Sequence, residues 1–253
     1  MRYMEFAPLP ELRPWVASIW TFSRAPSLPP TTHHIPLTGG AILSIDRGGE
    51  LTLTAERIAP LVTTVAGGEV YWGVHIWPAA ARAFLGLEPR LSREWIGPAR
   101  LRLPAAWCDR WRNVLDTHDE TQIVARIDDL LRELAAHAQP LDPLVMTAVF
   151  RIIETAGTEP IADVAKAAGL SPRQLRRRFA AQSALSPKEL ARIRRVRAAA
   201  AGAVLQADRW IELASRGGYA DQSHLVREFR EMLGISPDGF RAHAERILHR
   251  LVD

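Results

Sequence analysis

Two groups of side chains able to bond to the edges of nucleic-acid bases lie in the C-terminal part of the chain. They are Arg173, Arg176 and Arg177 in the first group, and Gln222, Ser223, His224 and Arg227 in the second. Arginine can donate two hydrogen bonds to guanine, and glutamine can form two with adenine. These residue types therefore predict base contacts in the major groove of double-stranded DNA.

Basic residues are concentrated in the same part of the chain. Residues 158–253 contain 17 Lys+Arg and 11 Asp+Glu, whereas residues 1–157 contain 15 and 17, and the whole chain carries a net charge of +4. Such an excess favours a polyanionic partner, because each neutralised phosphate releases counterions. The alternative is a solvated helix face. Among the basic residues between the two groups, we expect Arg194 to contact phosphate.

A pair of short helices is expected to position the first group. Residues 161–168 can form one helix and residues 172–182 another, with Gly169 between them in the left-handed conformation that ends a helix. Leu175 and Phe179 then lie on one face of the second helix, and the arginines lie on the other. An apolar face that fixes the helix and a polar face that stays open are what a DNA-recognition helix needs.

The second group repeats this layout. Equivalent residues lie 50 positions apart: Leu175 and Leu225, Phe179 and Phe229, Ser186 and Ser236. The second copy predicts a helix over residues 210–217, a glycine turn, and a helix over about 221–232. We therefore expect two helix-turn-helix units, joined by a helix over about 187–205.

The residues of both copies resemble the AraC/XylS transcription regulators. The resemblance is carried by Gly-Leu-Ser-Pro-Arg-Gln-Leu-Arg-Arg-Arg-Phe at 169–179, Ser-Pro-Lys-Glu-Leu at 186–190, Gly-Tyr-Ala-Asp-Gln-Ser-His-Leu-Val-Arg-Glu-Phe at 218–229 and Gly-Ile-Ser-Pro-Asp-Gly-Phe-Arg at 234–241. It implies a bacterial-type regulator whose two units read successive major grooves. Arg177 and Arg227 are equivalent across the repeat, so they are the strongest candidates for base contacts.

Two features depart from the family pattern. Ala184 stands where glycine is usual, and Gly202 and Ala203 replace a pair of leucines in the joining helix. A glycine inside a helix costs up to about 1 kcal/mol relative to alanine. We therefore expect the joining helix to bend or fray near Gly202, which would alter the separation of the two units.

The chain predicts an α+β protein in three parts. Residues 1–105 carry short β-prone runs between glycines and prolines, typical of a small antiparallel β domain. Residues 106–140 are expected to be connecting helices, with a candidate role in dimerisation. Residues 141–253 form the all-α DNA-binding part.

One apolar stripe marks the connecting helix expected over about 121–138, with Asp119 or Thr121 as its cap. The stripe consists of Ile123, Ile127, Leu130, Leu131 and Leu134, at helical spacing. It must be buried against another surface. The two alternatives are the β domain of the same chain and the same stripe of a second copy in a homodimer.

The β domain is a candidate sensor. Seven of the eight tryptophans precede residue 112, and the segments 7–16 and 73–78 resemble, more loosely, sensor domains found ahead of such DNA-binding domains. This implies an unknown small-molecule effector. Aromatic residues beside a polar group are typical of ligand pockets, so His75, Trp77 and Trp72 are the candidate effector-binding residues. Strand alternation pairs His75 with Trp77.

Other classes of function find little support. No catalytic motif is present, so we expect no enzyme, and no cofactor is implied. His33, His34, His75 and Glu69 match no metal-ligand spacing, so we expect no metal. The single Cys108, expected to be half-buried on a helix, argues against a methyl-accepting repair protein, which needs several cysteines.

The expected partners and location follow from the same features. No apolar run reaches the roughly 18–20 residues of a membrane span, and we expect a cytoplasmic protein without membrane contact. Double-stranded DNA is the main expected partner, and RNA polymerase and a second copy are further candidates. The rival interpretation is a sensor or interaction protein whose helical part binds a protein in place of DNA.

Overall fold

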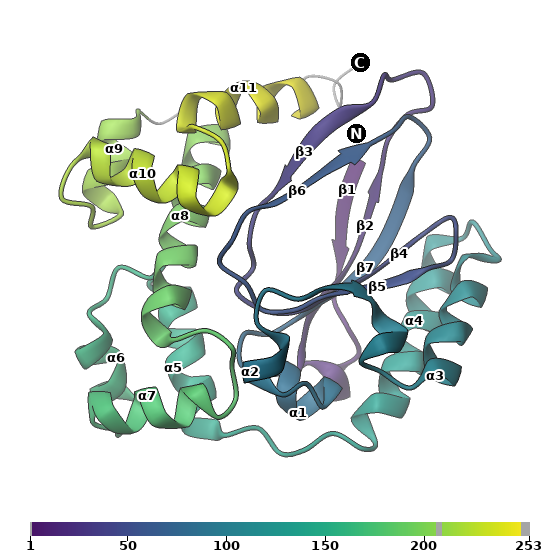
Figure 1. The fold of residues 1–253 in the computed structure, drawn as a ribbon, viewed down its shortest axis with the longest axis horizontal. Coiled ribbons are helices and arrows are strands. Elements are labelled where there is room, and N and C mark those ends of the chain that lie inside the picture. Colours follow the sequence, from purple (N-terminus) through teal and green to yellow (C-terminus); the bar gives the residue numbers. More distant parts are fainter. Residues whose placement is uncertain (1, 206–208, 249–253) are drawn as a thin grey trace.

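The computed structural model describes residues 2–205 and 209–248. A β-rich domain (residues 2–141) lies beside an all-α domain (residues 143–248), as Figure 1 shows. The α+β class and the antiparallel character of the N-terminal part are confirmed.

The β-rich domain is built from eight strands. They are β1 (Arg2–Phe6), β2 (Val16–Ser23), β3 (Thr31–Ile35), β4 (Ile42–Asp46), β5 (Leu51–Thr54), β6 (Leu61–Val65), β7 (Val70–Ile76) and β8 (Ile96–Pro98). Six of them form one antiparallel sheet in the order β1-β2-β7-β4-β5-β8, and β3 pairs with β6 in a separate ribbon. Strand β7 therefore lies inside the larger sheet, where β2 and β4 flank it.

Side chains alternate between the two faces of the larger sheet. Along β7, Trp72, Val74 and Ile76 enter the main apolar core, and His75 belongs to the opposite face. The short helices around the core are η1 (Pro10–Leu12), α1 (Ala81–Leu85), α2 (Pro89–Ser92), η2 (Ala99–Leu101), α3 (Ala105–Arg110) and η3 (Trp111–Leu115). Cys108 is buried on α3, and burial raises its thiol pKa to about 11.

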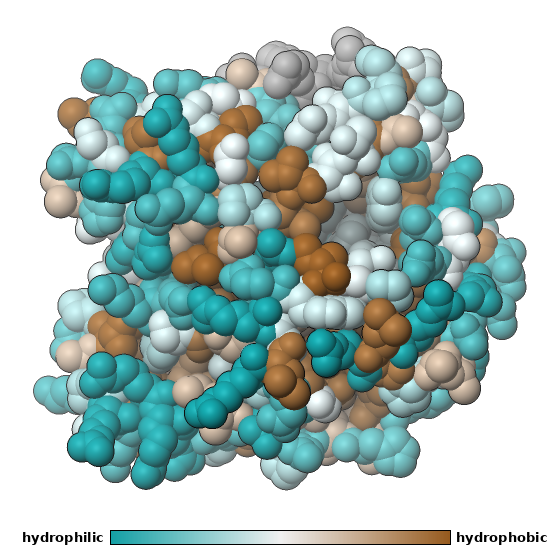
Figure 2. All heavy atoms as spheres, viewed as in Figure 1, coloured by the Kyte–Doolittle hydropathy of each residue, from teal (hydrophilic) through white to brown (hydrophobic). Residues whose placement is uncertain are grey.

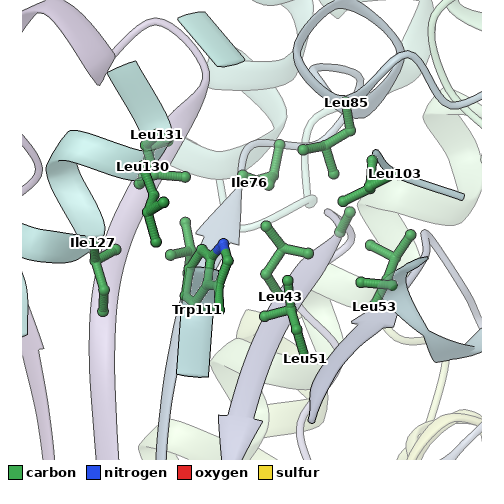
Figure 3. Close-up of a cluster of buried hydrophobic side chains, with 14 of the residues drawn as sticks. Leu43, Leu51, Leu53, Ile76, Leu85, Leu103, Trp111, Ile127, Leu130 and Leu131 are labelled. Atoms are coloured by element: carbon green, nitrogen blue, oxygen red, sulfur yellow. The ribbon is translucent and has the colours of Figure 1, made fainter. Parts of the chain in front are cut away.

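Helix α4 (Glu120–Ala135) closes this core. Its cap is Asp119, whose side chain accepts hydrogen bonds from the amides of Thr121 and Gln122. The predicted stripe is buried in the core of the β-rich domain of the same chain, the first of the two alternatives, with Ile127 fully buried. Figure 3 shows Ile127, Leu130 and Leu131 beside Trp111. Helices α3, η3 and α4 thus share the core of the β-rich domain.

Seven helices form the described part of the all-α domain. They are α5 (Pro143–Glu154), α6 (Ile161–Ala167), α7 (Pro172–Ala180), α8 (Pro187–Leu205), α9 (Trp210–Arg216), α10 (Gln222–Leu233) and α11 (Pro237–Leu248). One apolar core joins α5, α6, α7 and the start of α8, and another joins the rest of α8 to α9, α10 and α11. Helix α8 connects the two clusters, upright in the view of Figure 1.

Helix α8 continues through Gly202 to Leu205, so the helix does not fray at that residue, contrary to the expectation. Ala199, Ala200 and Ala203 are buried in the second core, where small side chains let neighbouring helices approach closely. Tertiary packing therefore offsets the low helix propensity of the glycine. None of the helices in the described part of the chain is long and apolar enough to span a membrane.

Candidate nucleic-acid interface

The first helix-turn-helix unit, here called the first head, consists of α6, α7 and the turn between them. Gly169 has a φ of +70°, the left-handed conformation predicted for it. Ser171 and Gln174 form a capping box that starts α7. Leu175 and Phe179 are fully buried against α5 and α8, as predicted.

The outer face of α7 carries three exposed arginines, Arg173, Arg176 and Arg177. In Figure 2, hydrophilic side chains cover the surface over α6 and α7. Arg178, next in the chain, points elsewhere: its Nε lies 2.8 Å from Oδ2 of Asp142 at the start of α5. This pair fixes α7 on its domain and leaves the three neighbouring arginines for a partner.

The second head consists of α9, α10 and the turn at Gly218, whose φ is +67°. Asp221 caps α10 by accepting a hydrogen bond from the amide of His224. Leu225 and Phe229 are fully buried. The exposed face carries Gln222, Ser223 and Arg227, the residues predicted to meet bases.

His224 differs from its predicted neighbours on α10. Its ring is half-buried and stands edge-on to Tyr219, with ring centroids 5.3 Å apart, and its Nε2 lies 3.8 Å from Oε1 of Glu228. The structure therefore places His224 against the body of the second head, at the edge of the exposed face and away from its centre.

A buried carboxylate ties the second head to α8. Oε1 of Glu228 lies 2.6 Å from Nε of Arg192, and Oε2 lies 3.6 Å from Nη2 of Arg195. Arg192 also pairs with Glu231 at 2.7 Å. Hydrogen bonds to charged groups are stronger than neutral ones, and burial removes competing water. Arg192 and Arg195 therefore hold the second head on α8. Fewer basic side chains remain for DNA phosphates than the local charge excess suggests.

Arg194 has surroundings that differ from those of the exposed arginines of α7. Leu190, Ile193 and Arg197 lie on the face of α8 that meets the β-rich domain: Leu190 and Ile193 lie close to Gly39, and Arg197 donates to the carbonyls of Pro36 and Leu37. Helical spacing puts Arg194 on that same face. Burial, together with the charge of Arg197, lowers the Arg194 pKa to about 10. Arg194 thus lies on the side of α8 that faces the β-rich domain, which argues against the predicted phosphate contact.

The three predicted effector residues do not form one site. Trp72 lies in the core, 3% exposed and stacked on Phe6. Trp77 follows β7 at the boundary between the domains, where its indole donates to the Arg13 carbonyl and its ring meets Phe150 of α5. His75 lies on the other face of the sheet from Trp72, as strand alternation predicted. The predicted pairing of His75 with Trp77 is not seen, because Trp77 lies beyond the end of β7 and packs against the apolar cores.

Sequence reasoning missed the side chains that surround His75. The Trp20 ring lies 5.7 Å from the His75 ring, and Oγ of Ser18 lies 3.2 Å from its Nδ1. A Cβ at Gly73 would lie only 2.4 Å from the Trp20 ring, so only glycine lets the indole lie across the strand. Burial lowers the pKa of His75 to about 4, which keeps its ring neutral. A glycine inside a strand was the available signal.

Metal binding finds no support among residues 2–205 and 209–248, where no group of three or more His, Cys, Asp and Glu side chains could hold an ion. His33 instead pairs with His243 of α11, with Nδ1 and Nε2 3.3 Å apart. Burial and the nearby His243 lower the pKa of His33 to about 4.

Comparison with known proteins bears on the all-α domain. A family model described as a helix-turn-helix domain matches residues 164–243, and this region carries an AraC-type helix-turn-helix domain, as its residues predicted. No curated protein sequence matches the chain significantly.

Three solved structures illustrate the similarity. The DNA-binding domain of AdpA, a global transcriptional factor in complex with a target DNA, is 25% identical over 43% of this chain and 98% of its own, with a TM-score of 0.39. ToxT from Vibrio cholerae is 10% identical over 96% and 98% of the two chains, with a TM-score of 0.47. ToxT from Vibrio cholerae O395 bound to (E)-4-(8-methylnaphthalen-1-yl)but-3-enoic acid is 13% identical over 89% and 97%, with a score of 0.46. Because all three scores lie below 0.5, the assignment of the domain rests on the family model and on its own residues.

Proposed function

We propose that this chain, whose C-terminal region carries an AraC-type helix-turn-helix domain, is a sequence-specific DNA-binding transcription regulator controlled by a small effector. One observation carries the proposal: α7 and α10 each bury Leu and Phe on one face and expose arginine on the other, in two copies along one chain. The exposed side chains are of the types that pair with guanine and adenine.

The joining helix supports simultaneous reading by both heads. Helix α8 has 19 residues, which at 1.5 Å per residue span about 28 Å. Two major-groove sites on one side of B-DNA lie about 34 Å apart. The length of α8 is therefore of the same order as the distance between successive major-groove sites.

The rival proposal is that the all-α domain binds a protein in place of DNA. What argues against it is the composition of the exposed face of α7, where Arg173, Arg176 and Arg177 crowd together without acidic neighbours on that helix. A protein interface usually has aromatic anchors at its centre. A charged face without such anchors is typical of phosphate and base contacts.

The experiment is selection of bound sites from a random DNA library, followed by salt titration of the selected site. A DNA reader that neutralises several phosphates gives a log–log slope of about −0.9 per contact. Enrichment of a site with two half-sites and a slope beyond about three contacts support the proposal. No enrichment, or a shallower slope, favours the protein-binding alternative.

For the effector, we propose a site on the face of the sheet that carries Ser18, Trp20 and His75. The indole nitrogen of Trp20 is buried and lacks a hydrogen-bond partner in the described structure. An unsatisfied buried donor is costly, so it marks a place where a ligand acceptor would be stabilised. Tyr3 stacks on the same indole, with centroids 6.3 Å apart, and adds apolar surface. Trp72 is not part of this proposal.

Tryptophan emission during titration with candidate effectors tests this site. Saturable quenching should be lost in Trp20→Phe and kept in Trp95→Phe, a matched change at a half-buried tryptophan elsewhere in the domain. DNA affinity should shift by the same factor as effector affinity, because coupling is reciprocal. Saturable binding that persists in Trp20→Phe combined with His75→Gln would place the effector elsewhere.

Three further predictions concern the partners and the location of the proposed regulator. RNA polymerase remains a predicted partner, and the cytoplasm remains the predicted location. A homodimer remains a prediction as well, although the α4 stripe is covered within one chain, so the dimer would use a different surface.

A further inference from the structure

One short segment of the β-rich domain, residues 56–62 between β5 and the start of β6, contacts both heads. Glu56 at its start bonds to the loop after α7, and Pro60 and Val62 at its end pack on Gly234 after α10. We propose that this segment sets the relative placement of the two recognition helices, with Glu56 as the positioning residue of the first head. The inference rests on the proposed DNA-binding function and specifies how half-site spacing is chosen.

Glu56 joins the domains through a buried carboxylate. Its Oε2 accepts hydrogen bonds from Oγ of Ser183 and the amide of Ala184, both at 2.6 Å, and its Oε1 accepts one from the amide of Ala79 at 2.9 Å. The residue is 3% exposed. The β-rich domain thus holds Oε1 of Glu56, and the all-α domain holds Oε2. These hydrogen bonds fix the position of the loop that follows α7.

Two arginines of the β-rich domain hold the same loop. Arg93 donates to the Ala184 carbonyl and pairs with Glu189 at the start of α8, both at 2.6 Å. The hydrogen bonds of Arg93 and Ser186 lower the pKa of Glu189 to about 2, although burial opposes the shift. Arg82 donates to the Ala181 carbonyl at the end of α7 at 2.8 Å. The first head is thus fixed at the point where its recognition helix ends.

The second head is held by the β3–β6 ribbon. Nδ1 of His34 lies 2.8 Å from the carbonyl of Leu233, the last residue of α10. Gly234 follows in the left-handed conformation, and a Cβ there would lie 3.2 Å from Pro60. The close approach of Pro60 to this glycine means that the end of α10 abuts the ribbon directly.

The two attachments leave the reading faces open. The contacts fall at the C-terminal ends of α7 and α10, whereas Arg173, Arg177, Gln222 and Arg227 remain exposed on the helices. The β-rich domain therefore does not cover these side chains. Glu56 and Pro60 are only four residues apart in the segment 56–62. This segment therefore holds the two heads at one spacing and orientation, in addition to the connection through α8.

The test measures how strictly the protein reads the spacing of half-sites. On a library-selected site, one base pair inserted between the half-sites rotates one by about 34–36° relative to the other. We expect this insertion to weaken wild-type binding at least about tenfold, as a mismatch does. Glu56→Gln turns one acceptor into a donor that faces Ser183 or Ala79. It should reduce the insertion penalty to about threefold or less while binding to the selected site stays within about threefold.

Ser183→Ala is the second variant, because it removes one partner of Glu56 and leaves the carboxylate with its two amides; it decides the outcome if Glu56→Gln does not fold. Glu50→Gln, the same change at an exposed position of the β-rich domain, is the matched control and should keep the wild-type penalty.

One outcome is that the wild type selects a site and loses the same affinity on insertion as folded Glu56→Gln or Ser183→Ala. In that case α8 alone sets the spacing and the inference is overturned. If the wild type selects no site at all, the proposed function itself fails. If the loss of affinity on insertion is smaller in these variants and unchanged in Glu50→Gln, the result supports the proposed role of residues 56–62.

Discussion

Nε of Arg192 in α8 lies 2.6 Å from Oε1 of Glu228 in α10, whose side chain is 7% exposed. The contact joins the helix that connects the heads to the helix that is proposed to read DNA. Glu228 lies three positions after the buried Leu225 and directly before the buried Phe229, on the inner face of α10, so its charge faces the domain and not the partner.

Glu228→Gln should therefore destabilise the second head. The change leaves Arg192 and Arg195 without their shared carboxylate, at a cost of about 1.5–3 kcal/mol, as for hydrogen bonds to charged groups. Chemical denaturation followed by circular dichroism measures the loss. Glu231→Gln, at an exposed partner of the same Arg192, should cost less than about 0.5 kcal/mol. Equal losses in the two variants would show that burial of Glu228 is unimportant.

Arg194→Ala tests whether the side of α8 that faces the β-rich domain takes part in DNA binding. Because Arg194 lies on the face that meets the β-rich domain, we expect the salt slope of DNA binding to be unchanged. A phosphate contact would instead reduce the slope by about 0.9. Titration of wild type and variant between 50 and 200 mM salt, about the range over which phosphate contacts are felt, distinguishes the two.

Ile127→Glu tests the place of the α4 stripe. Ile127 is fully buried in the core of its own chain, so a carboxylate there has no partner and should cost more than about 4 kcal/mol. We expect loss of cooperative unfolding of the β-rich domain in calorimetry. Ala125→Glu, on the exposed side of the same helix, should leave the unfolding transition in place. A folded Ile127→Glu chain of altered mass in sedimentation would show that the stripe faces a second subunit.

His75 should make folding sensitive to acid. Its pKa is about 4 in the folded protein and 6.5 in a solvated chain, so the unfolded state binds more protons between these values. Stability therefore falls as the pH drops from 6.5 to 4 and does not depend on this group above 6.5. Urea titrations at several pH values should show a weaker loss in His75→Gln. His118→Gln, at an exposed position, should match the wild type, and an equal loss in all three would remove the role given to His75.

The repeat and the periodic stripes could be predicted from sequence because they depend on local spacing. Asp119 caps α4, and Leu175 and Leu225 occupy equivalent buried positions, since helical periodicity alone determines which side chains share a face. The relation between His75 and Trp72 was likewise predictable from strand alternation.

Contacts between residues far apart in the chain were not predictable. Glu56 meets Ser183 across the domain boundary, and Trp20 lies over Gly73 on a neighbouring strand; neither relation leaves a periodic signal. The basic charge of α8 overstated the number of phosphate contacts for the same reason. The carboxylate that pairs with Arg192 lies on another helix and could not be assigned to it from sequence. Gly202 stays helical because packing outweighs its propensity.

The most direct test of the central claim is the base preference of Arg177→Ala and Arg227→Ala. Each variant should lose about 1–3 kcal/mol on the selected site and relax the preference at one base pair, in a different half-site for each variant. Arg178→Ala is the matched control on α7, since its guanidinium pairs with Asp142, and it should keep the wild-type base preference. Unchanged preference at every position in both Arg177→Ala and Arg227→Ala would contradict the assignment of α7 and α10 as the helices that read DNA.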